Sequence, residues 1–549
     1  MPFSLVLFFL SIGAIFFSDV FNTYKTSQLS FLLVLLTPAL LFLSAKMEKK
    51  KIYVPVKETA FYLLFIIFST ISTFLAINKD TAVQLLLTYY SGYLFFIFAF
   101  NYQENLNKYF KWFLIIISVF SSLIFLINKI YPLRLFKDGA SLFYNGYYHN
   151  EVGNVIILGI LICFYLFLFK KKNVFIALLL FFLPFFIFSY SRSAYLAIIV
   201  VGTILLFIKK NWLLVALIIL ITGLFFVTTK EVNRFFPTSV RKFVEKRLLL
   251  PKEKSFTGKR QQHFYYALLA ATENPFFGIG PNNLYSLTGK YQFNWEEQTN
   301  TAHNFILDII AENGTLAGIS FLMFLALLFI KMKKNLYYYL FFSLTLIFLF
   351  DFSYRYPSVF LFWIILAAIS LPHDKDNLKI NNAAILLSII TLFIFSQIIL
   401  ISKGLYNLGL VDLSLKIYPL NKETYRKVIE ANIRQGEKTE ALKNITKFNS
   451  VFNKGSNVNL NIGKYYEDLN EKKQAIYFYE KAVYDRPLLT STILSKIVFL
   501  NVSLYGEDVG RVETEKFINQ FKKDVKIPKN SDVEKIIKNY CYDYKLKCQ

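Results

Sequence analysis

Histidine and cysteine are scarce in this sequence, which has 4 His and 3 Cys among 549 residues. The loops that we assign below to the outer face contain no cluster of Asp and His of the kind that binds a metal. Cys541 and Cys548 lie near the C-terminus, where they could form a disulfide in an oxidising compartment or remain free thiols. The sequence therefore gives no indication of a metal site and leaves the state of these two cysteines open.

Acidic residues are also in short supply, with 36 Asp and Glu against 61 Lys and Arg, which gives a net charge of +25. Such a charge could indicate nucleic-acid binding, but the basic residues concentrate in short loops between apolar runs. The chain is 55% hydrophobic, with a mean hydropathy of +0.44, and a soluble domain cannot bury that much apolar surface. We therefore expect a polytopic membrane protein that does not bind nucleic acid.

A membrane span needs roughly 20 mostly apolar residues, and we count about thirteen such runs. The predicted spans are 2–18, 29–45, 59–77, 82–100, 109–128, 152–169, 174–190, 194–208, 212–228, 314–330, 335–351, 357–371 and 382–402. No small-residue cleavage site follows the first run, so we expect it to be a retained helix rather than a removed signal peptide. The predicted fold class is all-α, with a helix bundle at 1–402 and a polar domain at 403–549.

The short loops predict an orientation, because Lys and Arg in short connections favour the cytoplasm. The even-numbered loops carry the basic clusters, at Lys46, Lys49–Lys51, Lys57, Lys108, Lys111, Lys170–Lys172, Lys209–Lys210, Lys331, Lys333–Lys334, Lys375 and Lys379. The odd-numbered loops are poorer in basic residues. We therefore expect a cytoplasmic N-terminus, with a long loop at about 229–303 and the C-terminal domain on the outer, periplasmic side.

The C-terminal domain has the spacing of short amphipathic helices. The segment "NIGKYYEDLNEKKQAIYFYEKAVYDRP" fits the tetratricopeptide (TPR) pattern, and the unit before it fits in part at Ala441 and Ile445. The matching residues are Gly463, Tyr466, Ala475, Tyr479, Ala482 and Pro487. Helix pairs of this kind stack into an α-solenoid that binds partners, so we expect this domain to bind rather than to catalyse.

Most of the histidines, and several arginines, fall on the predicted outer side, which indicates a site facing outward. The residues concerned are His149, His263, His303, Arg192, Arg260 and Arg355. Arg192 lies in a very short connection close to hydrocarbon, where it either reaches lipid phosphate or anchors a phosphate-bearing ligand, because a guanidinium matches phosphate oxygens. Arg260 offers a second such group beside Lys259, although the pair could also be an ordinary surface charge pair.

The stretch "TAHNFILDIIAENG" places polar residues just ahead of the predicted span 314–330. Thr301 or Asn300 could cap a helix that starts near His303, and Asn304, Asp308 and Glu312 would share one face. His303 does not lie on that face, so Glu312 is expected to fix a helix break at Gly314. A histidine at a helix N-terminus has a lowered pKa, which suits a general base, but by residue type alone a lone histidine is more often structural.

The nearby segment "PFFGIG" contains Gly278 and Gly280. A lone Gly-x-Gly without a preceding strand is weak evidence of a phosphate-binding loop, and tight-turn geometry explains both glycines.

At these residues the chain resembles the O-antigen ligase family, which includes lipid A-core ligases, bacterial protein O-oligosaccharyltransferases and Wzy-type polysaccharide polymerases. The signature His-Asn-x-x-Leu followed by Glu-x-Gly is present as His303, Asn304, Leu307, Glu312 and Gly314. Upstream, "SRSA" at 191–194 and "GKR" followed by "PFFGIG" at 258–280 occur in the family's order. The resemblance covers roughly residues 140–370.

The resemblance implies a GT-C-like glycosyltransferase of the bacterial inner membrane that works without metal or other cofactor. It would move glycan from an undecaprenyl diphosphate-linked donor to an acceptor hydroxyl on the periplasmic face, inverting the anomeric carbon. His303 matches the family's catalytic histidine, and Arg192 and Arg260 match its diphosphate-binding arginines. His149 and Arg355 align with no family motif; they could line the same site or serve as anchors at the membrane interface.

Several alternatives remain at this point. Within the family, a polymerase of repeat units competes with a ligase or oligosaccharyltransferase, and the acceptor could be lipid A-core, another glycan or a protein that docks on the TPR-like domain. A membrane transporter is a different class, although the internal repeats and discontinuous helices typical of carriers are absent from the sequence. A membrane-anchored TPR scaffold is a third class.

Overall fold

The computed structural model describes most of the chain. The described residues are 1–20, 24–130, 148–171, 173–189, 191–211, 259–295, 299–373, 377–379, 382–452 and 456–548. The predicted span 212–228 and the first half of the predicted outer loop lie outside them.

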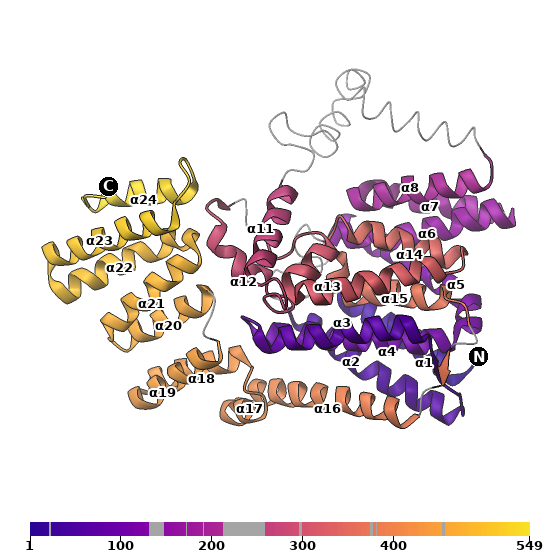
Figure 1. Ribbon diagram of the computed structural model, residues 1–549, viewed down its shortest axis with the longest axis horizontal. Coiled ribbons are helices and arrows are strands. Elements are labelled where there is room, and N and C mark those ends of the chain that lie inside the picture. The colour runs from indigo at the N-terminus through magenta and orange to yellow at the C-terminus, as the bar shows by residue number, and fades with distance from the viewer. Residues whose placement is uncertain are drawn as a thin grey trace, which may run out of the picture.

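A bundle of long apolar helices forms the larger part of the molecule (Figure 1). Its members are α1 (Phe3–Val20), α2 (Tyr24–Met47), α3 (Val56–Leu75), α4 (Lys79–Asn101), α5 (Gln103–Ile130), α6 (Tyr148–Lys170), α7 (Val174–Ser189), α8 (Arg192–Ile208), α13 (Phe305–Lys331), α14 (Leu336–Phe348), α15 (Pro357–Ser370) and α16 (Asn382–Asn407). Each predicted span except 212–228 corresponds to one of these helices. The prediction of an all-α membrane bundle is therefore confirmed for the described residues, apart from one two-residue strand pair.

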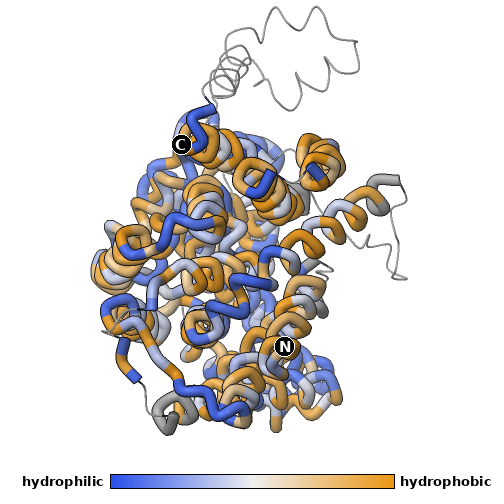
Figure 2. The backbone as a smooth tube through the Cα atoms, turned by 90° about the vertical axis from the view of Figure 1, so that its right-hand side faces the viewer, coloured by the Kyte–Doolittle hydropathy of each residue, from blue (hydrophilic) through white to orange (hydrophobic). Residues whose placement is uncertain are grey.

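Length and hydropathy alone support the membrane assignment. Among the described residues, 8 helices are long and apolar enough to cross a membrane. One of these, Pro487–Tyr505, belongs to the C-terminal domain, and the others belong to the bundle. Viewed from the end at which the N-terminus lies, the bundle helices are largely hydrophobic and hydrophilic connections face the viewer (Figure 2).

Aromatic packing holds the bundle together around Trp363, which is fully buried on α15. Its ring stacks on Phe341 of α14 at 5.0 Å and on Phe321 of α13 at 6.1 Å. Its indole N–H donates to the Thr345 hydroxyl at 2.8 Å, so the polar atom of this side chain is satisfied. Since lipid tails are as apolar as the helices, close packing of this kind, rather than burial from water, stabilises membrane helix pairs.

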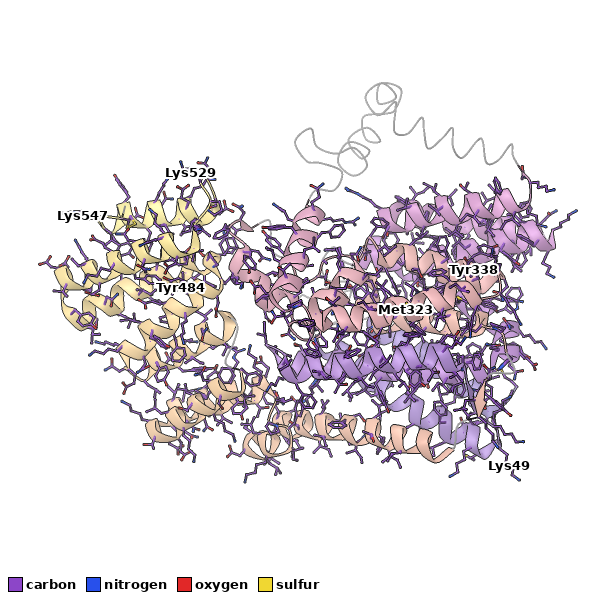
Figure 3. The ribbon with its side chains drawn as sticks, in the orientation of Figure 1. Lys49, Met323, Tyr338, Tyr484, Lys529 and Lys547 are labelled. Carbon is purple, nitrogen blue, oxygen red and sulfur yellow. A yellow bond between two sulfur atoms is a disulfide. The ribbon has the colours of Figure 1, made fainter. Side chains whose placement is uncertain are left out.

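The basic loops gather at one end of the bundle. Lys331, at the end of α13, pairs with the buried Glu58 at the start of α3 at 3.0 Å. Strand β1 (Tyr53–Val54) pairs with β2 (Leu378–Lys379), which joins the loop after α2 to the loop after α15. In Figure 3, Lys49 lies at this end, far from Tyr484, Lys529 and Lys547 of the C-terminal domain. The loops predicted to be cytoplasmic therefore lie opposite the domain predicted to be periplasmic.

The C-terminal domain consists of stacked helical hairpins. Its helices are α17 (Val411–Ile417), α18 (Lys422–Gln435), α19 (Lys438–Val451), α20 (Ser456–Asp468), α21 (Lys472–Asp485), α22 (Thr490–Tyr505), α23 (Glu507–Val525) and α24 (Asp532–Asp543), with a short helix η5 (Pro487–Leu489) between α21 and α22. A Cβ added at Gly463 would lie 2.6 Å from the Tyr479 ring, so only glycine allows α20 and α21 to approach this closely. Ala475 and Ala482 are fully buried in the same hairpin. These residues of the predicted motif pack the hairpin, while membership of the TPR class stays a prediction.

Cys541 and Cys548 form a disulfide near the C-terminus. The bond closes the segment that follows α24, where Leu546 packs into the core of this domain. The structure thus resolves the alternative between a disulfide and two free thiols in favour of the disulfide.

The C-terminal domain contacts the bundle side of the molecule through the segment that contains α12 (Leu284–Thr288) and η2 (Gly289–Tyr291). The Trp295 N–H donates to the Asp532 carboxylate at 3.0 Å, and the Val533 N–H donates to the Phe293 carbonyl at 3.2 Å. α11 (Lys259–Glu273) and α12 lie between the bundle and the C-terminal helices (Figure 1). The domain is therefore attached next to the end of the bundle at which α13 begins.

Candidate active site

The N-terminus of α13 positions His303. Asn304 is the helix cap, because its side-chain oxygen accepts the Leu307 N–H at 3.0 Å. The expected cap at Thr301 or Asn300 is therefore wrong: the Thr301 hydroxyl accepts the His303 N–H at 3.3 Å instead. His303 itself has a φ of 53°, in the left-handed region, and lies just outside the helix. This turn separates its ring from the face that carries Asp308 and Glu312.

Glu312 is fully buried and holds three segments together. Its carboxylate accepts the N–H of Asn282 at 2.9 Å and the N–H of Leu284 at 3.2 Å, and it pairs with the Arg355 guanidinium at 2.7 Å. The Asp308 carboxylate lies 3.7 Å from the same guanidinium and also accepts the Ala302 N–H at 2.8 Å. We call Asp308, Glu312 and Arg355 the carboxylate cluster. One guanidinium faces two carboxylates in this cluster, and the cluster connects α13 to the start of α12 and to η4 (Ser353–Arg355).

Arg355 was one of the residues expected to line the site or to anchor the protein at the membrane interface. The structure places it in the carboxylate cluster, with its side chain 13% exposed, and the two carboxylates raise its pKa against the opposing effect of burial. Within the described part of the chain, its Nε and Nη1 atoms are buried without a hydrogen-bond partner. These two donors are the part of the cluster that could still bind an oxygen of a ligand.

The predicted helix break lies at Gly314, which has a φ of 87° and a ψ of 168° inside α13. A Cβ at this position would lie 2.1 Å from the Phe276 carbonyl oxygen. The segment around Gly278 fits against this break, since a Cβ on Gly278 would lie 2.4 Å from the Glu312 carbonyl, and the Gly280 N–H donates to that carbonyl at 2.8 Å. "PFFGIG" is thus a backbone partner for the kinked helix, and close approach explains its glycines.

The His303 ring lies between two aromatic rings. It stacks on the His263 ring of α11, with centroids 5.0 Å apart and an interplanar angle of 19°, and Phe352 meets it edge-on at 5.0 Å. Its Nδ1 atom is buried without a hydrogen-bond partner among the described residues. Burial lowers the pKa of His303 to about 3, with smaller contributions in the same direction from His263 and Arg260. The expected direction of the pKa shift is confirmed, but burial rather than the helix dipole is its largest cause.

Arg260 lies on the first turn of α11, one turn before His263. Burial lowers its pKa, the nearby Asp351 raises it, and the positive charge of Arg192 lowers it again. Arg192 is the first residue of α8, is exposed, and follows Ser191, whose hydroxyl caps the helix by accepting the Ala194 N–H. Arg192, Arg260 and His303 therefore come from three separate elements to one region, which we call the cationic cluster.

Asp351 is a member of the site that the sequence did not single out. It is buried in the connection between α14 and η4, and its Oδ1 accepts the N–H of Ser353 at 3.1 Å and its hydroxyl at 2.5 Å. The Asn154 amide on α6 donates to the Ser353 hydroxyl, and the Ser191 hydroxyl donates to Asn154 at 3.4 Å. This network links the carboxylate that faces Arg260 to the segment just before Arg192. Ser191 belongs to the "SRSA" segment, but no motif or periodicity marks Asp351, Ser353 or Asn154.

Two further candidates cannot be placed in the site. The side chains of His149, near the start of α6, and of Lys259, at the start of α11, lie outside the described residues. Their suggested roles stay predictions.

One comparison with known proteins found a match, which is to a family model. The family model described as O-Antigen ligase matches residues 175–322, a range that contains Arg192, Arg260, His303, Asn304, Glu312 and Gly314. No curated protein matches the chain. At the family level the match indicates a membrane glycosyltransferase of the ligase or polymerase kind. Residues 175–322 thus form a domain of the O-antigen ligase family within this membrane protein.

Proposed function

We propose that this protein transfers a glycan from an undecaprenyl diphosphate-linked donor to an acceptor hydroxyl, as an O-antigen ligase or a protein O-oligosaccharyltransferase. The observation that carries the proposal is the cationic cluster. In it a buried, uncharged histidine lies in the same region as two arginines, and Asp351 is the carboxylate near Arg260. A site with this charge is suited to a ligand that brings two or more negative charges.

The two arginines would bind the diphosphate of the donor. Burial is the largest cause of the lowered pKa of Arg260, and the positive charge of Arg192 lowers it further. A bound diphosphate would replace the repulsion between the two arginines by attraction to both groups. Guanidinium groups offer paired N–H donors that match phosphate oxygens. Because negative charge grows on the diphosphate as its bond to the sugar breaks, the same contacts would strengthen in the transition state.

His303 would act as the general base. It would take the proton of the acceptor hydroxyl while the hydroxyl oxygen forms a bond to the anomeric carbon, and the bond from that carbon to the diphosphate breaks with its electron pair on the leaving group. A single displacement of this kind inverts the anomeric carbon. General-base assistance contributes typically about 10²- to 10⁴-fold.

The pKa of about 3 belongs to His303 in a site without ligand. A diphosphate near Arg260 would raise this pKa, because negative charge favours the protonated imidazole. Donor binding would therefore prepare the base, and the carboxylate cluster, together with Asn304 and Gly314, would hold the turn that carries it.

The topology that we propose has the N-terminus in the cytoplasm of a bacterial cell and the C-terminal domain in the periplasm. The basic loops lie at one end of the bundle, as the positive-inside rule requires for a cytoplasmic face. The disulfide between Cys541 and Cys548 lies in the domain at the other end and suits an oxidising compartment. The site lies at the same end as that domain.

Mass spectrometry of the glycoproteins and lipopolysaccharide of a strain that lacks this chain tests the proposal. Loss of a glycan from one acceptor, restored by the wild-type gene but not by His303→Asn, is the expected result and identifies the acceptor. Full restoration by His303→Asn would remove His303 from the mechanism.

A polymerase is the second candidate, because the family match is compatible with either activity. The length of the glycan on the lipid carrier in the same deletion strain separates the two. Long chains that remain on the carrier indicate a ligase, whereas single accumulated repeat units indicate a polymerase.

Asn282 and Leu284 donate backbone hydrogen bonds to Glu312. The C-terminal domain is attached to the segment that follows these two residues. This position close to the site suits the domain to holding an acceptor. A truncation after Asn407 tests this role. Loss of transfer with donor binding retained supports a role in holding the acceptor. If the truncated protein still transfers glycan at the wild-type rate, the domain is required neither for chemistry nor for acceptor binding, and a purely scaffolding function of the chain is excluded.

A further inference from the structure

We infer that His263 is a positioning residue for His303: its stacked imidazole fixes the plane of the His303 ring, and a proton on His263 would oppose a second proton on His303. The inference deepens the proposed function and rests on the role of His303 as the base. His263 belongs to no family motif identified above, and it touches the proposed base rather than the reacting atoms.

The geometry of the two rings supports this role. Their centroids are 5.0 Å apart and their planes are within 19° of parallel. The N–H bonds of an imidazole lie in the ring plane, so in this arrangement they point past the neighbouring ring rather than at it. The stacked rings can therefore influence each other's orientation and protonation, but they do not pass a proton from one to the other.

Three contacts fix the orientation of the His303 ring. His263 covers one side of it, and Phe352 meets it edge-on at 5.0 Å. The backbone of His303 is held in the left-handed region by the cap at Asn304 and by the Thr301 hydroxyl. His263 is 7% exposed, so this second ring is packed inside the protein rather than in solvent.

The charges around the pair come from five segments of the chain. α11 contributes Arg260 in addition to His263, and α8 contributes Arg192. The connection before η4 contributes Asp351, which faces Arg260. The remaining charged groups, Arg355 of η4 with Asp308 and Glu312 of α13, pair with one another. The groups that act on His303 are therefore His263 and Arg260, and both favour the neutral ring.

A stacked imidazole pair can accept one proton far more easily than two, because two positive charges at this distance repel strongly in a buried site. A proton on His263 at low pH would therefore oppose a proton on His303. Removing the second titratable ring, while keeping an aromatic surface in its place, should raise the pKa of His303 and leave the ring plane unchanged.

The test is an NMR titration of the full-length protein in lipid nanodiscs, labelled with [ε1-¹³C]histidine. The chain has 4 His, so the spectrum is simple, and His303→Asn and His263→Phe assign the two signals. In the wild type we expect His303 to remain neutral from pH 8 down to about pH 5, in line with its pKa of about 3. In His263→Phe we expect its pKa to rise by about one unit.

The control is His373→Phe, which removes an exposed histidine at the opposite end of the bundle and should leave the His303 signal unchanged. His263→Gln is the second variant, for which we expect the same rise in pKa together with a changed His303 chemical shift, because the ring surface is lost. If His263→Phe does not fold, the Gln variant decides by the same criterion. An unchanged His303 titration in the folded variant overturns the inference.

This measurement does not depend on glycan transfer, so the two proposals can fail separately. A transfer-competent His303→Asn protein would contradict the proposed function. A transfer-deficient His303→Asn protein, together with an unchanged titration in His263→Phe, would contradict only the role of His263.

Discussion

The carboxylate cluster and the cationic cluster lie at the same end of the bundle and differ in how their charges are balanced. In the carboxylate cluster, Glu312 meets Arg355 at 2.7 Å and two backbone N–H groups, so nearly every charge has a partner. In the cationic cluster, Arg192 and Arg260 repel each other, and His303 is kept neutral by burial. The first arrangement stabilises a shape, and in the proposed function the second would be completed by an anion.

The criterion that distinguishes the two clusters is whether a charged side chain has an oppositely charged partner within the protein, and residue type alone does not reveal this. Arg355 and Arg260 are both arginines on the predicted outer side, and the sequence makes both of them candidates for the site. The Arg355 guanidinium lies 2.7 Å from the Glu312 carboxylate and 3.7 Å from that of Asp308. Arg260 instead interacts with one carboxylate, Asp351, and with a second arginine. Substitutions in the two clusters should therefore fail in different ways.

The largest expected effect is that of Glu312→Ala. It leaves the Arg355 charge buried without its nearest carboxylate, and removing one partner of a buried ion pair costs about 3–5 kcal/mol. It also leaves the N–H groups of Asn282 and Leu284 without their acceptor. We expect loss of most folded protein, measured by the yield of the monodisperse peak in size-exclusion chromatography. Wild-type yield and thermal stability would mean that the carboxylate cluster does not hold the fold.

A smaller effect on affinity, with the fold intact, is expected from Arg260→Ala. Charge-assisted hydrogen bonds contribute about 1.5–3 kcal/mol each, so donor binding should weaken by roughly 10- to 150-fold. Inorganic diphosphate as a competitor of transfer provides the measurement, and its inhibition constant should rise by the same factor. Lys290→Ala, which removes a half-exposed lysine that pairs with Glu273, is the matched control. Equal inhibition of Arg260→Ala and wild type would contradict diphosphate binding at this position.

The smallest effect concerns the pH dependence of stability. The pKa of His303 is about 3 in the folded protein and about 6.5 in an unfolded chain. Between these values the unfolded state binds more protons, so the stability that His303 contributes is present above pH 6.5 and is lost as the pH falls. The loss is at most about 1.4 kcal/mol per pH unit.

Thermal midpoints at pH 7 and pH 5 measure this effect. The wild type should lose more stability over this interval than His303→Asn does, because asparagine does not titrate. An equal loss in both proteins would show that His303 is not the group responsible.

Much of the fold could be predicted from the sequence because membrane spans are a local property. A run such as 357–371 is apolar enough to be assigned without knowing its neighbours, and it corresponds to α15. The break at Gly314 could also be predicted, since glycine after a polar turn marks a helix end. The cap could not, because Thr301 and Asn304 are both good capping residues and only the surrounding contacts favour Asn304.

The site could be predicted only in part. Arg192, Arg260 and His303 were recognised through the family motif rather than from their own spacing. The stacking of His263 on His303 and the proximity of Asp351 to Arg260 depend on how α11 packs between distant segments. No periodicity connects such residues, so their meeting is visible only in three dimensions.

The central claim is that the cationic cluster both binds the donor diphosphate and carries the base. The most direct test compares purified wild-type protein with His303→Asn, using lipid-linked glycan extracted from the deletion strain, and measures donor binding and glycan transfer on the same preparation. The account predicts transfer reduced by about 10²- to 10⁴-fold with donor affinity within a few-fold of wild type. Unchanged transfer, or donor binding lost together with transfer, would contradict it.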